Sequence, residues 1–173
     1  MRRILTYLVS LGATIAATVL YHPQSASATT PEGYTSTLLA MGRLSEMDAS
    51  NSLPHGPKAE ENERQWMQRT QGMSDMYVQS NVWAPGGTTG WHSHPGQSLI
   101  IVTAGTVTEY EGHDSDCKPH VYKAGMGFVD LGGEHMHILR NEGAVEAKTI
   151  AVQFVPADAM RRIDVADPGN CHF

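Results

Sequence analysis

The feature of this chain that most restricts its fold is a series of short strand-like segments between residues 76 and 155. The segments alternate apolar with polar residues or are rich in Val, Ile and Leu, and Gly or Pro residues separate them. Many short strands at even spacing are typical of an all-β sandwich or barrel. The expected segments are residues 76–84, 88–94, 98–103, 106–110, 120–123, 127–131, 135–140 and 147–155.

The regions on either side of this series have less regular patterns. Residues 35–44 are apolar and predict a first strand, whereas residues 45–64 are polar and contain turn-forming Pro and Gly, as in a surface loop. Residues 60–69 favour a short helix, and the tail is expected to have a helical turn around Arg161 and Arg162. We therefore expect an N-terminal strand and loop at 29–74, a barrel at 75–156 and a tail at 157–173.

The N-terminus has the order of a secretory signal peptide. Arg2 and Arg3 precede an apolar stretch at 4–21, and the small residues 26–28 follow it. This order predicts cleavage after Ala28. An uncleaved membrane anchor is the alternative, but polar residues dilute the apolar stretch. We therefore predict a secreted or periplasmic protein, with no membrane contact once residues 1–28 are removed.

Length and charge restrict the partners. The chain has 173 residues and a formal net charge of −6. This length suits one domain with its own core. An acidic surface argues against nucleic acid as a partner. A small molecule is therefore the expected ligand or substrate, and a homodimer is left open.

Cys117 and Cys171 are the only cysteines. An even pair in an exported protein usually forms a disulfide. This bond would tie the C-terminal tail to a loop in the middle of the domain. A catalytic thiol is the weaker alternative, because Cys171 lies too close to the chain end to be held rigidly.

Two His-x-His pairs indicate a metal centre. His92 and His94 form the first pair, and His135 and His137 form the second. In a strand, residues two apart point to the same face, so each pair can aim two imidazoles at one point. Clustered imidazoles are typical metal ligands. The alternative is that one pair consists of ordinary core or surface histidines.

The segment at 86–105 resembles the first motif of the cupin family. That motif is a glycine, five residues, His-x-His, three or four residues, a glutamate, six residues and a glycine. The matching residues are Gly86, His92, His94 and Gly105. The glutamate position is held by Ser98, which Gln97 precedes.

A second segment resembles the second cupin motif, which is a glycine, five residues, Pro-x-Gly, two residues, a histidine, three residues and an asparagine. Gly125, Gly133, His137 and Asn141 match if one residue is inserted after Gly133, and Leu131 stands at the proline position. The chain is thus similar to small exported single-domain cupins. The resemblance implies an antiparallel β-barrel of the double-stranded β-helix or jelly-roll type, with a metal held by His92, His94 and His137.

The missing glutamate leaves the fourth ligand open. A serine hydroxyl is a poor ligand for a divalent ion, so Ser98 does not replace a carboxylate. His135 shares strand parity with His137 and is a candidate for this position. The alternative is that the Gly132-Gly133 turn bends the backbone and leaves His135 at the rim.

The expected cofactor is one divalent transition metal. Imidazoles without a carboxylate suit Zn, Cu, Ni, Mn or Fe, which the sequence does not distinguish, better than magnesium or calcium. The leading hypothesis is a metal-dependent, dioxygenase-like oxidoreductase that acts on a small organic molecule, with Gln97 and Ser98 lining its pocket. A non-catalytic module that binds metal or a small ligand is the alternative. Catalytic residues are not assigned, although Asp130 and Glu134 are candidates to orient a ligand histidine.

Overall fold

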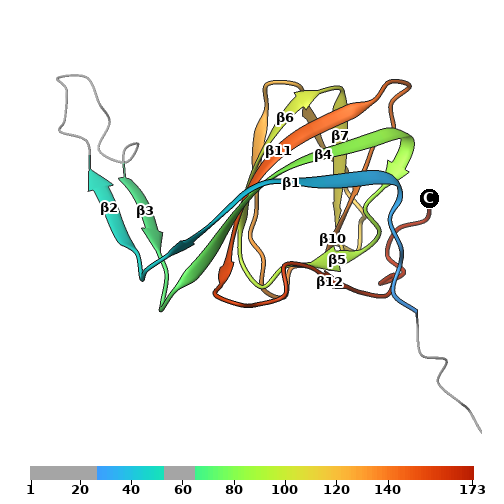
Figure 1. Cartoon of the computed structure of the whole chain (residues 1–173). Coiled ribbons are helices and arrows are strands. Elements are labelled where there is room, and N and C mark those ends of the chain that lie inside the picture. The colour runs from blue at the N-terminus through green and yellow to red at the C-terminus, as the bar shows by residue number, and fades with distance from the viewer. Residues whose placement is uncertain (1–26, 53–64) are drawn as a thin grey trace, which may run out of the picture.

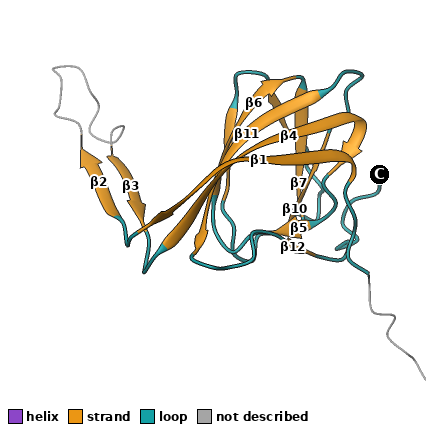
Figure 2. Cartoon of the chain, in the orientation of Figure 1, coloured by secondary structure: helices purple, strands orange, loops and turns teal. Residues whose placement is uncertain are grey.

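The computed structural model describes residues 27–52 and 65–173. This part of the chain consists of strands and loops without a helix (Figure 2). No helix in these residues is therefore long and apolar enough to cross a bilayer. The apolar stretch of the expected signal peptide lies outside the described residues.

Ten strands form one hydrogen-bonded antiparallel sheet that folds into a barrel, and its two facing halves are here called the first and the second sheet (Figure 1). The long strand β4 (Ser74–Thr88) pairs with β1 (Glu32–Leu44) and β11 (Ala147–Pro156). Beyond β11 follow β6 (Ser98–Ala104) and β9 (Gly127–Asp130). These five strands make the first sheet.

The second sheet contains the shorter strands. Their order is β12 (Ile163–Asp164), β5 (His92–Ser93), β10 (His137–Arg140), β7 (Thr106–Glu111) and β8 (His120–Lys123). The pair of Arg140 with Thr88 joins β10 to β4 and so links the two sheets. The predicted all-β, cupin-type antiparallel barrel is confirmed.

The core fills the space between the sheets. Its largest fully buried members include Trp83, Val102 and Val107, from β4, β6 and β7. Inward and outward residues alternate along β6 and β11, as the period of a pleated strand requires. Burial of these apolar side chains is the main stabilising contribution to the barrel.

A two-stranded arm extends from the barrel. Strands β2 (Asp48–Ser52) and β3 (Gln65–Arg69) pair with each other where β1 and β4 leave the barrel, and they lie to one side of it (Figure 1). The expected helix at 60–69 is therefore wrong for residues 65–69. Pairing with β2 overrides the local helix propensity of this segment. The expected loop at 45–64 also contains a strand, and residues 53–64 lie outside the described part.

An ion pair joins β1 to β4 near the point where these strands lead into the arm. The Arg43 guanidinium donates to Asp75 Oδ1 at 2.7 Å, and the backbone N–H of Asp158 donates to Asp75 Oδ2 at 3.0 Å. The hydrogen bond from Arg43 lowers the pKa of Asp75 to about 2, and the bond from Asp158 acts in the same direction.

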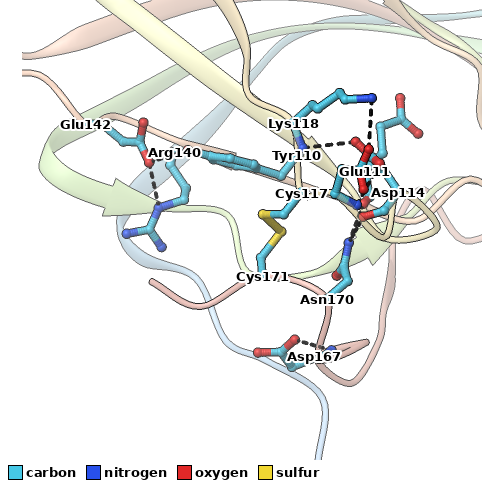
Figure 3. The surroundings of a disulfide bond; sticks show 12 residues. Tyr110, Glu111, Asp114, Cys117, Lys118, Arg140, Glu142, Asp167, Asn170 and Cys171 are labelled. Atoms are coloured by element: carbon cyan, nitrogen blue, oxygen red, sulfur yellow. Dashed lines mark hydrogen bonds and ion pairs between the residues drawn. A yellow bond between two sulfur atoms is a disulfide. The ribbon is translucent and has the colours of Figure 1, made fainter.

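The C-terminal tail packs against the second sheet. Cys117 and Cys171 form the predicted disulfide, with their Cα atoms 5.3 Å apart (Figure 3). Cys171 belongs to a buried cluster with Trp91, Tyr110 and Ile138. The expected helical turn near Arg161 is wrong, because the chain bends at Arg161 and then forms the short strand β12, which pairs Ile163 with Ser93.

Candidate metal centre

The structure brings three of the predicted ligands together. His92 lies in β5 and pairs directly with His137, the first residue of β10. His94 follows β5, and one ring nitrogen from each of the three residues lies within 4.8 Å of the others. The Nε2 atoms of His92 and His137 are 3.2 Å apart. Register between two strands thus joins residues that are far apart in the sequence.

Each of the three imidazoles is oriented through its other nitrogen. His92 Nδ1 lies 2.9 Å from the Gly90 carbonyl, His94 Nδ1 lies 2.6 Å from the Arg161 carbonyl, and His137 Nδ1 lies 2.9 Å from Glu109 Oε1. The partners of His92 and His137 are acceptors, so in these two rings Nδ1 carries the proton and Nε2 offers a lone pair. Ligand histidines in metalloproteins have this arrangement. His94 Nδ1 also lies 2.9 Å from the Gln153 amide nitrogen, and its Nε2 faces Asp130. The donor set therefore fits a transition metal.

Burial and neighbouring charges shift the pKa values of these residues. Burial, followed by the proximity of His137, lowers the pKa of His92 well below its usual value. Burial also lowers the pKa of His94, although Asp130 opposes this shift. For His137 burial acts downward, but the bond to Glu109 and the negative charge of Asp130 outweigh it, and the pKa rises.

A cavity of about 220 Å³ opens beside the three histidines. A chain of hydrogen bonds crosses its wall, because Asn81 Oδ1 accepts from Tyr34 Oη and from Gln79 Nε2, both at 2.9 Å. Apolar side chains from the core, among them Trp83, form another part of the cavity wall. The cavity therefore offers both polar and apolar contacts to a small molecule.

A carboxylate reaches this cavity from a neighbouring strand. Ser98, at the position of the usual cupin glutamate, pairs with Asp130 of β9 and donates its hydroxyl to Asp130 Oδ2 at 3.3 Å. The same oxygen lies 3.6 Å from His94 Nε2, and the side chain is 1% exposed. Asp130 Oδ1 accepts from the Gly132 N–H at 2.9 Å. The missing glutamate thus does not leave the cavity without a carboxylate.

Two glycines allow the motif loops to meet. A Cβ on Gly132 would lie 2.3 Å from the Gly96 carbonyl oxygen, and a Cβ on Gly96 would lie 2.0 Å from that of Phe154. Gly132 also has a positive φ of 69°. The Gly133 N–H donates to the His94 carbonyl at 2.7 Å. These contacts fix the loop that carries His94 against the loop that follows Asp130.

Two residues predicted for the site lie outside it. His135 precedes β10, is 46% exposed and lies beside Glu111, away from the three histidines. The turn at Gly132 and Gly133 breaks the strand parity on which its expected position depended. Gln97 faces away from the cavity that its neighbour Ser98 lines, and its amide donates to Gln68. Adjacent residues of extended chain point to opposite faces.

Glu109 is the site residue that the sequence reasoning missed. Its side chain is 6% exposed and accepts from Tyr122 Oη at 3.2 Å as well as contacting His137. One signal was available, because Glu109 shares strand parity with Val107 in the expected strand at 106–110. A glutamate on a buried face is rare unless it has a partner.

The barrel and the site together define a class of protein. His92 and His137 lie on paired strands, His94 follows the first of them, and all three side chains approach one another inside the barrel. Asn141, the last residue of the second motif, is buried, and its amide donates to the carbonyls of Trp83 and Val145. In these respects the barrel and its site resemble a cupin domain.

Known structures with a similar barrel include an oxalate oxidase, at 28% identity over 52% of this chain and 46% of that one, with a TM-score of 0.44. A cupin-like protein from Thermotoga maritima is 22% identical over 53% of this chain and 65% of that one, with a TM-score of 0.45. A predicted oxalate decarboxylase from the same organism is 19% identical over 49% of this chain and 83% of that one, with a TM-score of 0.40.

The chain spans about half the length of the first of these structures. All three TM-scores lie below 0.5, so the resemblance to cupins rests on the barrel and the motif residues of this chain. No protein-family model and no curated protein matches the sequence.

Proposed function

We propose that this cupin binds one divalent transition metal through His92, His94 and His137 and acts as a metal-dependent oxidoreductase on a small organic molecule. One observation carries the proposal. One ring nitrogen from each histidine lies within 4.8 Å of the others, and the Nδ1 atom of each ring is held by a backbone carbonyl or by Glu109. Solvated or ordinary core histidines have no reason to share this orientation.

A metal bound here would supply Lewis-acid or redox chemistry to a molecule in the cavity. The residues of the chain would position that molecule and handle its protons. Asp130 is the buried carboxylate of the cavity wall, and its Oδ2 can accept a proton from a bound molecule. Ser98 holds this oxygen in place.

The size of the cavity restricts the substrate. Its volume of about 220 Å³ is below the range of pockets for drug-sized ligands. Arg162 lines it and adds a positive charge, while its own Nη2 donates to the Thr89 carbonyl at 2.6 Å. The charge of Arg162 is paired with Asp164 Oδ1 at 2.5 Å, so these features favour a small polar molecule without selecting for a charge.

The protein is proposed to act outside the cytoplasm. The disulfide between Cys117 and Cys171 is consistent with an oxidising compartment. The expected signal peptide agrees with export, to the periplasm or the exterior.

Metal analysis combined with oxygen consumption tests the function. Protein isolated from its native compartment is expected to contain one tightly held transition metal, and to consume dioxygen with one member of a panel of small hydroxy acids, keto acids and phenols. His92→Ala with His94→Ala should abolish oxygen consumption and remove the metal held by the three inner histidines, whereas His172→Ala, at an exposed tail position, should preserve both properties.

The alternative is a non-catalytic module. The Arg161 side chain, which lines the cavity, is already bound to Gln79 and Gln153 and stacks on the Tyr77 ring, 4.1 Å from its centroid. This network favours binding of a ligand over catalysis of a reaction on it. Tight metal without oxygen consumption for the whole panel would favour this function.

A further inference from the structure

A second group of metal-ligating side chains lies at the rim of the barrel. Glu111, His113 and His135 each offer a ligand atom, and these atoms lie within 4.8 Å of one another. None of the three lines the cavity of the inner histidines. We propose that these three residues, here called the rim group, form a second site for a divalent transition metal.

The donor types are those of a transition-metal site. Glu111 Oε2 lies 3.5 Å from His113 Nδ1 and 4.0 Å from His135 Nδ1. Two imidazoles and one carboxylate are a common protein ligand set for zinc, and they leave positions for water. The side chains of His113 and His135 are 64% and 46% exposed, so they are free to adjust toward metal–ligand distances of about 2.0–2.2 Å.

The backbone holds the two contributing loops together. Glu111 ends β7 and pairs with His137 of β10. The next N–H, of Gly112, donates to the Met136 carbonyl at 2.8 Å, and a Cβ on Gly112 would lie 2.2 Å from Met136 Cγ. The loop of His113 thus lies directly against the loop of His135.

The disulfide fixes the same loop from the other side. Cys117 closes the segment that begins at Glu111, and Cys171 attaches it to the tail. Asn170 Nδ2 donates to the carbonyls of Glu111 and Asp114, at 2.9 and 2.7 Å (Figure 3). Because the backbone of Glu111 and His113 is already ordered, binding of an ion would cost mainly side-chain entropy.

The rim group is separate from the inner histidines but close to them. A cavity of about 60 Å³ is lined by Glu111 and His135 and also by Glu109 and His137. On the other side the rim group faces an open hollow of about 540 Å³, which His120 and Asp114 also line. A metal ion from solvent can therefore reach the rim group without passing through the inner cavity.

Zinc titration against a chromophoric chelator tests this proposal, with the full chain after removal of any polyhistidine tag. The His92→Ala, His94→Ala variant should still bind one equivalent of zinc. Adding His113→Asn and His135→Asn should remove that equivalent, while adding His172→Asn, an exposed control, should not. In the same His92→Ala, His94→Ala background, Glu111→Gln should weaken zinc binding by more than tenfold. Loss of a residue that binds the metal lowers affinity more than loss of a residue that only hydrogen-bonds to such a ligand.

The outcomes separate the two sites. No zinc in the His92→Ala, His94→Ala variant overturns the rim site, and so does an equivalent that survives the loss of both His113 and His135. The proposed inner centre is tested by the converse variant, His113→Asn with His135→Asn, which should retain one equivalent.

Discussion

The buried carboxylate of Glu109 should control metal affinity without touching the metal. Glu109 Oε1 accepts a hydrogen bond from His137 Nδ1 at 2.9 Å and thereby fixes the tautomer of that imidazole. The Glu109 side chain is 6% exposed. Removing a carboxylate in this position typically costs 10–100-fold in metal affinity. This range corresponds to about 1.4–2.7 kcal/mol.

Two substitutions should fall at opposite ends of this range. Glu109→Gln keeps the shape and a carbonyl acceptor for His137 but removes the charge, so zinc affinity should fall about tenfold. Glu109→Leu also removes the acceptor and leaves the buried Nδ1–H unpaired, so the loss should approach about 100-fold. Both affinities are measured by chelator competition, at a temperature where circular dichroism shows a fully folded protein.

Tyr122→Phe is the matched control. It removes the other hydrogen bond to Glu109, from Tyr122 Oη at 3.2 Å, and leaves the contact with His137 intact. Its zinc affinity should remain within about twofold of wild type, because this bond lies on the side away from the imidazole. Wild-type affinity in Glu109→Leu, or an equal loss in Tyr122→Phe, would refute the reasoning.

Three further predictions concern folding. His92→Ala with His94→Ala should leave the β-sheet circular dichroism unchanged, because the core of the barrel does not include these rings. Reduction of the disulfide should lower the free energy of unfolding by ~4 kcal/mol, for a sequence separation of 54, as measured by urea denaturation. Asp75 has its pKa lowered to about 2, so its stabilising contribution is complete above pH about 4 and lost as the pH falls toward 2. Between these pH values wild type should lose more stability than Asp75→Asn.

Each of these has a clear contrary result. An unfolded spectrum for the double histidine variant would mean that the imidazoles support the core. An unchanged urea midpoint after reduction would mean that the tail packs as well without its covalent bond. Parallel stability curves for wild type and Asp75→Asn below pH 4 would remove the ion pair from the explanation of acid sensitivity.

Local patterns predicted an all-β sandwich or barrel and the shared face of His92 and His94, whereas the barrel itself and the role of His137 were implied by the resemblance to cupins. The strand segments depend on residue period and on Gly and Pro turns, which are properties of neighbouring residues. His92 and His94 share a face because they are two apart in extended chain. The disulfide followed from compartment and cysteine count.

Predictions failed where pairing or a turn decided the outcome. Residues 65–69 form β3 because β2 pairs with them, although their composition favours a helix. For His135 the sequence left two positions open, and the structure has the rim position, because β10 begins two residues later, after the Gly132-Gly133 turn. The backbone at such turns depends on contacts with distant loops, here the approach of Gly132 to Gly96.

The carboxylates of the site show most clearly why motif reading is incomplete. A motif describes the residues of one chain segment, and in the first cupin motif Ser98 stands where a glutamate is expected. The cavity, however, is lined from several strands, and register places Asp130 opposite Ser98 and Glu109 behind His137. Each carboxylate is far in sequence from the motif position that it supports. A serine at the glutamate position therefore does not by itself imply a site without negative charge, since a neighbouring strand can supply it.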